Sequence, residues 1–411
     1  MENYQRTERP FLAENLRYYA RNMGGFQRNT QKIDPVNSTS STPSGTTIIN
    51  LPANSLVSPA INLHATFTTS AAGFLPAHTA SLIQRLEVLI NGVPVQQINE
   101  YGVLYNLIAN ANMNYSKLLG DFIGLNTVAG HGNVAYTGSI PIWLGLMGSL
   151  DPYWVDTGVV GNIQVRITWA ANSVLGGAAA STFTVTAISA FCDTAELNDG
   201  GLYRSLIAGR LLEGGSLELP FKDYHEAQQA RGANSGQMRT AVVGQSIDRI
   251  ILSQRAAVAD SGAVVNGLAP SQVFLADSLV GLFFTIDGVR FPQYTTDNVH
   301  EQLMQTRSSW GNLDDPNSGD SLCFIATVDA PQTLQAPTQN QYRDNRWQFA
   351  VRINDEEGDR VASGYNTRGM NSDIICTYTG TGGTAGNTLF MFVERTSKLV
   401  VMAGQVSQVV L

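Results

Sequence analysis

The sequence repeats itself at an offset of 196 residues, and this repeat restricts the possible folds more than any other property. Ile90-Asn91-Gly92-Val93 aligns without a gap with Ile286-Asp287-Gly288-Val289. Over positions 90–107, six of 18 residues are identical at this shift (90, 92, 93, 97, 103 and 107), whereas average residue frequencies give about one. A chain of 411 residues also exceeds the usual size of a single hydrophobic core. The repeat therefore predicts two domains of similar fold.

Both copies share one local design. An apolar strand pattern leads into Asn-Gly or Asp-Gly, dipeptides that accept the positive φ angles of a tight hairpin turn. A short helix is expected next, with Asn99 as the cap in the first copy and Thr295 or Thr296 in the second. A third match, of 165–167 with 351–353 at an offset of 186, predicts another pair of equivalent strands.

Short strands dominate the rest of the pattern, and long amphipathic helices are nearly absent. Runs of β-branched and apolar residues predict strands at 46–51, 61–69, 82–90, 163–169, 183–191, 247–252, 279–286, 322–328, 347–353, 389–394 and 399–410. The 39 glycines fit the many tight turns that such strands require. We therefore predict an all-β chain with an arm and linker at 1–44, a first sandwich at 45–207 and a second at 208–411.

Charge is scarce and unevenly distributed. Charged residues make up 14% of the chain, against roughly a quarter in ordinary soluble domains, so we expect much of the surface to be covered by partners. The net charge is −8, which argues against a body that binds nucleic acid, including sequence-specific binding. Three widely separated cysteines predict no disulfide framework, and neither a signal peptide nor a membrane-spanning run is expected.

The N-terminal segment has a character of its own. Its first 32 residues hold six basic and three acidic residues, a net charge of +3, which leaves −11 on the rest. Apolar and aromatic residues that share one side of a short helix alternate there with arginine: Phe11, Leu12, Leu16, Arg17, Tyr18, Tyr19 and Arg21. We interpret this segment as an arm that meets a separate partner. A tail with an ordinary helix is the alternative.

Two tandem sandwiches, each with a strand, a hairpin and a short helix, resemble the double jelly-roll major capsid proteins of tailless icosahedral phages and adenovirus-like viruses. The resemblance rests on residues 86–92 leading to 101–108, and on 283–288 leading to 299–304, and it covers roughly 45–411. It implies two jelly rolls of eight strands side by side. It further implies a homotrimer that forms a pseudo-hexagonal block in an icosahedral virion shell, assembled in the host cytoplasm. Implied partners are neighbouring capsomers, penton or minor capsid proteins, and an internal membrane. In similar phage capsid proteins the N-terminal segment lies beneath the trimer, so the resemblance implies that the seven arm residues named above contact the inner face of the shell or that membrane, with the arginines meeting phosphate headgroups.

Catalytic and metal-binding motifs are not found. The five histidines are scattered, and the sequence contains no H-E-x-x-H, G-x-S-x-G or phosphate-loop motif. The glycine-rich stretch 380–386 precedes a strand pattern instead of a helix, so we interpret it as a hairpin loop and not as a dinucleotide site. We predict no enzyme, no cofactor and no metal site. The acidic clusters at 314–320 and 355–359 are interpreted as solvated turns, with calcium binding left open.

Two other functions remain possible at this stage. A carbohydrate-binding or adhesin protein is compatible with two sandwiches, and it requires exposed aromatic platforms. Five tryptophans are available for that purpose, although Trp169 and Trp347 lie in strand patterns and are expected in the core. A β-sandwich glycosidase requires a pair of carboxylates that no pattern singles out.

Overall fold

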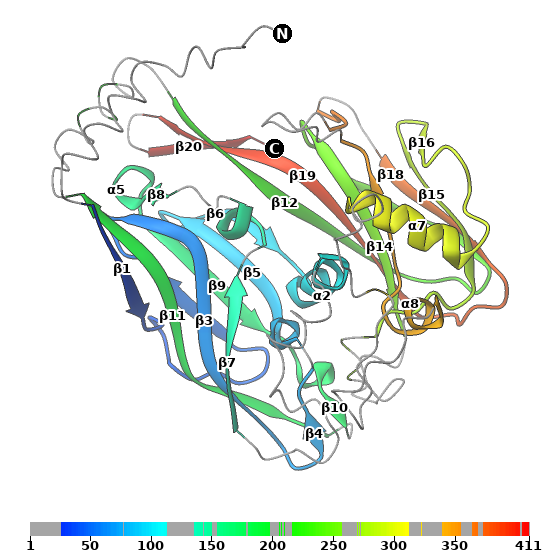
Figure 1. Ribbon diagram of the computed structural model, residues 1–411, viewed down its shortest axis with the longest axis horizontal. Helices are drawn as coiled ribbons and strands as arrows, with labels where there is room; N and C mark the ends of the chain where they lie inside the picture. The colour runs from blue at the N-terminus through cyan, green and yellow to red at the C-terminus, as the bar shows by residue number, and fades with distance from the viewer. Residues whose placement is uncertain are drawn as a thin grey trace, which may run out of the picture.

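The chain folds into two antiparallel β-sandwiches that lie side by side (Figure 1). The computed structural model describes residues 26–76, 78–112, 135–142, 144–149, 154–177, 180–197, 216–256, 273–311, 339–354, 364–368, 373–402 and 405–410, with single residues 205, 207, 209, 269, 271 and 322. The all-β prediction is confirmed.

The first sandwich has two facing layers. Sheet A has the order β1 (Phe26–Ile33), β11 (Phe183–Leu197), β3 (Leu56–Thr69) and β7 (Ala135–Ile142), with β8 (Val155–Asp156) beside β3. Sheet B has the order β2 (Thr46–Asn50), β9 (Ile163–Trp169), β5 (Ile83–Ile90) and β6 (Val93–Ile98). A small pair, β4 (Gly73–Phe74) and β10 (Gly176–Gly177), lies at one end.

The second sandwich repeats this plan. Sheet C has the order β12 (Ser216–Ala230), β19 (Thr388–Met402), β14 (Ile247–Arg255) and β17 (Gln348–Arg352), with β20 (Gln405–Val410) pairing on β19. Sheet D has the order β13 (Ser235–Ala241), β18 (Asp373–Gly380), β15 (Leu279–Ile286) and β16 (Val289–Phe291).

Strand order shows that the two halves are duplicates. When the eight principal strands of each half are numbered along the chain, sheets A and C both read 1-8-3-6, and sheets B and D both read 2-7-4-5. This is the order of a jelly roll, in which two sheets share one core. Alternation accounts for that core, since in β3 the residues Ile61, Leu63, Ala65 and Phe67 point inward and are buried, with polar residues between them. The chain is thus a double jelly roll.

The repeat-defining hairpins occupy the same position in both halves. Asn91-Gly92 joins β5 to β6, and Asp287-Gly288 joins β15 to β16. Gly92 has φ +81° and Gly288 has φ +80°, with Asn91 at +51° and Asp287 at +48°. Both central residues of each turn are therefore left-handed, the conformation that Asn-Gly and Asp-Gly favour.

The predicted start of the first sandwich is wrong. The structure places β1, within the segment assigned to an arm and linker, at the edge of sheet A, where it pairs with β11 from Phe26↔Leu197 to Ile33↔Ala190. The stretch assigned as linker is also tied to the sandwich, because Ser41 bridges Val185. The strand is polar on most positions, as edge strands tolerate, and so it lacks an apolar signal. We keep 207/208 as a proposed boundary, between the end of β11 and the start of β12.

Two further expectations are corrected. Residues 165–167 lie in β9, the seventh strand of its half, whereas 351–353 reach from β17, the sixth, into the following loop. The two segments look alike because alternating buried strands use similar residues, not because they are equivalent. The loop 380–386 joins β18 in sheet D to β19 in sheet C, so it crosses between layers and does not form a hairpin.

Helices fill the connections. They are η1 (Thr79–Leu82), α2 (Tyr101–Asn112), α4 (Leu146–Ser149), α5 (Thr157–Val160), η2 (Asn172–Val174), α7 (Val299–Ser309) and α8 (Gln339–Asn345). Asn298 caps α7 by accepting from the Glu301 amide, in place of the expected Thr295 or Thr296. Thr296 is instead buried and bonds the backbone of β15. In the described part of the chain, no helix has the length and apolar character needed to cross a membrane.

Candidate assembly surfaces

Sheet C is buried on both of its faces, which joins the two jelly rolls into one unit. Along β19, Leu389, Met391 and Val393 point into the core of the second jelly roll. Phe390 and Phe392, on the opposite face, belong to the apolar cluster of the first jelly roll. Burial on both faces explains why this strand reads as a continuous apolar run.

Helix α2 lies at this seam between the jelly rolls (Figure 1). It is buried from Tyr101 to Ala111 and carries no charged residue. The Gln348 side chain of β17 donates to the Leu107 carbonyl at 3.1 Å, and Asn106 donates to the Ser271 carbonyl at 3.3 Å. These buried amides satisfy backbone oxygens across the seam, so they fix its register as well as its packing.

A second polar link connects β6 of the first jelly roll with β12 of the second. The Gln96 amide donates to the Lys222 carbonyl at 3.0 Å and to Asp223 Oδ1 at 2.9 Å. Its own oxygen accepts from the Leu146 backbone amide at 2.6 Å. The buried Gln96 side chain thus links β6 to β12 and to the start of α4.

Charged residues form a network within sheet C. Lys222 Nζ lies 2.8 Å from Asp248 Oδ2, and Arg249 Nη1 lies 3.0 Å from Glu394 Oε2. The network crosses β12, β14 and β19, and the Asp248 side chain is only 2% exposed. Buried charges are tolerated when they are paired in this way, and removal of one partner leaves the other uncompensated.

One carboxyl group at the seam has an unusual environment. Glu226 of β12 lines a cavity of about 370 Å³, together with Gln84, Arg85 and Glu100 of the first jelly roll. Burial, and then the nearby Glu100 carboxylate, raise the pKa of Glu226 to about 7. The seam therefore contains a group that titrates near neutral pH.

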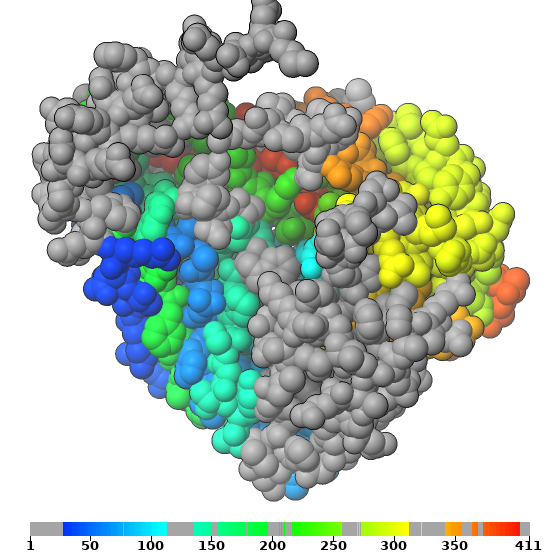
Figure 2. Space-filling view, in the orientation of Figure 1, coloured from blue at the N-terminus to red at the C-terminus, as the bar shows by residue number. Residues whose placement is uncertain are grey.

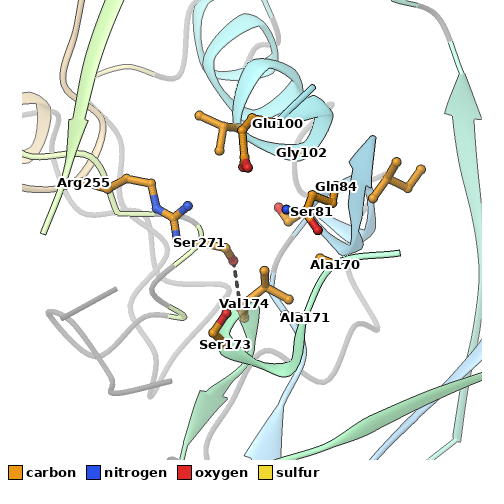
Figure 3. Close-up of a pocket in the computed structure, with 12 residues that line it drawn as sticks. Ser81, Gln84, Glu100, Gly102, Ala170, Ala171, Ser173, Val174, Arg255 and Ser271 are labelled. Atoms are coloured by element: carbon orange, nitrogen blue, oxygen red, sulfur yellow. Dashed lines mark hydrogen bonds between the residues drawn. The ribbon is translucent and has the colours of Figure 1, made fainter. Parts of the chain in front are cut away.

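A smaller cavity of about 90 Å³ lies further along the seam (Figure 3). Arg255 and Ser271 of the second jelly roll line it opposite Ser81 and Glu100 of the first. The Ser271 hydroxyl donates to the Val174 carbonyl at 2.9 Å, and no histidine is among the described residues of the lining. The Ser271 hydroxyl is thus held by a backbone carbonyl of the first jelly roll.

The residues predicted as sites have different outcomes. The two hairpins lie at equivalent turns, as described above. The arm residues Phe11, Leu12, Leu16, Arg17, Tyr18, Tyr19 and Arg21 lie outside the described residues, as do the acidic clusters 314–320 and 355–359. The strand expected at 322–328 lies outside them too, apart from Leu322, which is buried in a turn.

Other chemistry-bearing residues are mostly structural. Trp169 and Trp347 are fully buried, as expected, and so are not exposed platforms for a sugar. Cys192 and Cys376 are buried free thiols, and burial raises the pKa of both, that of Cys192 to about 11. Among the described residues, no group of three or more His, Cys, Asp or Glu side chains is placed to hold a metal ion.

The seam amides were not identified from the sequence. One signal was available, because Asn106 and Gln302 are amide residues at the 196-residue offset, each within the helix that follows a hairpin. An amide at the same position of both copies indicates a shared structural role, and both side chains are buried. Gln96 and Gln348 have no such local signal, since their partners lie on distant strands.

The topology and the shared core define the chain as a double jelly-roll protein. No protein-family model matches the sequence, and no curated protein matches it. Solved structures share the fold across nearly the whole chain. The VP54 protein of PBCV-1, as fitted into a reconstruction of the virophage Sputnik, is 10% identical with a TM-score of 0.64, and the match covers 92% of this chain and 95% of that chain.

Two further structures are similar. The Faustovirus major capsid protein is 10% identical with a TM-score of 0.58, covering 92% of this chain and 90% of that chain. The mavirus major capsid protein is 11% identical with a TM-score of 0.52, covering 90% of this chain and 88% of that chain. The resemblance to double jelly-roll capsid proteins, predicted from the repeat, is confirmed at the level of the fold.

Proposed function

We propose that this chain is a major capsid protein that assembles as pseudo-hexagonal trimers into the shell of an icosahedral virion. The observation that carries the proposal is the duplicated jelly roll with a fixed seam: one chain supplies two like sandwiches in a defined relative orientation. Three such chains around a closed symmetry axis supply six. The fold of the Faustovirus and mavirus major capsid proteins supports the same assignment.

Low charge supports a role with extensive contacts. Only 14% of the residues are charged, and the apolar seam uses one flank of each jelly roll. The opposite flanks remain for other copies of the chain, and side-to-side burial covers sheet edges that would otherwise pair at random. In this role the chain is a structural protein and its function is assembly, not catalysis.

The test is the mass and shape of the purified full-length chain. We expect light scattering to give three times the chain mass of 44.3 kDa, and negative-stain images to show blocks with six-fold outlines. A monomer at every concentration, with no hexagonal block in the images, would overturn the proposal.

The finer roles remain part of the proposal. We propose neighbouring capsomers and penton or minor capsid proteins as partners in a shell assembled in the host cytoplasm, and an internal membrane as the partner of the arm. Co-sedimentation with phosphatidylserine vesicles, compared with neutral vesicles, tests the arm. An R17A/R21A double variant is expected to lose the preference for anionic vesicles, because its arginines meet the headgroups. Equal sedimentation with both vesicle types would exclude the role of the arginines, and no sedimentation with either would exclude the membrane contact.

A further inference from the structure

The helices that follow the two hairpins are anchored in the same way. In the first jelly roll the Asn106 amide of α2 donates to Ser81 Oγ at 2.7 Å, just before β5. In the second, the Gln302 amide of α7 donates to the Leu279 and Val280 carbonyls at 3.1 and 2.9 Å, at the start of β15. These amides are 196 residues apart, so α2 and α7 hold equivalent positions on their own jelly rolls.

Their outer sides have different surroundings. The second jelly roll covers α2 through the outward face of sheet C, where Ile251, Ala350 and Phe392 are buried in the shared cluster. On α7 the outer side remains open, with His300, Met304 and Ser308 exposed at helical spacing. Tyr294 bonds Gln305 beside them, and Met304 and Tyr294 are 46% and 48% exposed.

Within the chain the surface equivalent to that face of sheet C is the outward face of sheet A, on β3 and β7. It presents Asn62, Thr137 and Ser139 as exposed residues, with His64 and Thr66 half-buried. Thr66 and Thr137 share a hydrogen bond of 2.9 Å across the two strands. Neither strand contains an Asp, Glu, Lys or Arg residue. The face is polar and uncharged.

We propose that the outer side of α7 binds the outward face of β3 and β7 in a second copy of the chain, repeating between chains the contact that α2 makes with sheet C within one chain. The inference rests on the proposed assembly and names its contact surfaces. The repeat supplies the geometry. The two jelly rolls, each with its helix, have the same fold, and sheets A and C, which receive the helices, have the same strand order.

The chemistry of each pair is matched. The uncharged α2 meets an apolar sheet face, and the more polar α7 faces a sheet of Thr, Ser and Asn. Met304 and Tyr294 supply exposed apolar surface on and next to α7, and the exposed His300 and Ser308 are polar, a mixture typical of non-obligate interfaces. In Figure 2, α7 (yellow) and the strands of sheet A (blue to green) lie at opposite sides of the molecule. The contact is therefore heterologous, and it closes into a ring of copies if the rotation permits.

The sharpest test joins two different full-length variants. Met304→Cys and Thr137→Cys chains are mixed under dissociating conditions, reassembled and treated with a short bismaleimide reagent. We expect cross-linked dimers that contain one chain of each kind, and none from either variant alone, because a heterologous contact sets position 304 against position 137 of the next chain. A mixture of Val93→Cys with Thr137→Cys is the matched control, since Val93 is 64% exposed but belongs to a hairpin.

A substitution provides an independent readout. Met304→Arg is expected to raise the dissociation constant of the trimer at least tenfold, while its unfolding midpoint as an isolated chain stays that of the wild type. Val93→Arg is expected to leave both unchanged. A stable trimer without 304–137 cross-links would overturn this inference and leave the proposed function intact. A wild-type chain that is monomeric at every concentration would overturn both.

Discussion

Sheets A and C have the same strand order and the same number of principal strands, yet their outward faces differ in chemistry. The outward face of sheet C carries Phe390 and Phe392 and is buried against the first jelly roll. That of sheet A, on β3 and β7, carries mainly threonine, serine and asparagine and is open in the single chain. The inward faces of both sheets are apolar. The two jelly rolls therefore share a topology because both have apolar cores, whereas the chemical character of each outward face depends on the surface that covers it.

The largest effect is expected from truncation of the buried outward face. Phe392→Ala should lower the free energy of unfolding by about 4 kcal/mol, because it removes a fully buried ring from the seam. Thr184→Ala, on the exposed outward face of β11 in sheet A, should change it by less than about 0.5 kcal/mol. Urea unfolding of both variants checks the contrast, and similar losses would contradict it.

Charged pairs should show the same contrast at a smaller scale. Asp248→Ala in sheet C should cost about 3 kcal/mol, because Lys222 then loses a partner at 2.8 Å in a largely buried network. Asp193→Ala in sheet A removes a partner of Arg28, whose side chain is 64% exposed, and should cost less than about 1 kcal/mol. Equal costs, measured by denaturant unfolding of dissociated chains, would show that the two sheets do not differ in this respect.

Substitutions in the two hairpins should have equal effects on stability, which would show that the two jelly rolls share this turn. Gly92→Ala and Gly288→Ala should each cost about 1 kcal/mol, because φ is near +80° at both and strains an L-residue. A Cβ atom at either position would meet nothing within 4 Å, so the backbone alone determines the cost. Thermal unfolding of the two variants should therefore give equal shifts, and a large difference would argue against equivalent turns.

One further contrast, at the seam, concerns pH. The pKa of Glu226 is raised in the folded chain to about 7, from 4.5, so its contribution to stability is complete below pH 4.5 and is lost as the pH rises through 7. Glu226→Gln removes this dependence. Unfolding measured at pH 5 and pH 8 should show a smaller loss of stability in the variant than in the wild type. An identical pH dependence in both proteins would exclude a role for this carboxyl at the seam.

Much of the fold was predictable because its signals are local. The strands predicted at 163–169 and 279–286 coincide with β9, whose inward residues alternate with polar ones, and with β15, which is an apolar and aromatic run. Strands β1, β12 and β13 were not predicted. They lie at the edges of their sheets, and their polar and charged residues obscure the alternation of apolar and polar positions. The match of 165–167 with 351–353 failed for the opposite reason, since alternation alone does not distinguish one buried strand from another.

The candidate surfaces were less predictable than the fold. Repetition in the amino-acid order was enough to establish two jelly rolls, their hairpins and the helices that follow, because turn dipeptides and apolar alternation act over a few residues. Which sheet face is buried became clear only in three dimensions. The Gln96–Asp223 and Gln348–Leu107 bonds join residues 127 and 241 positions apart, and only the packed chain brings them together. Burial is a property of neighbours in space, and no short stretch of sequence specifies those neighbours.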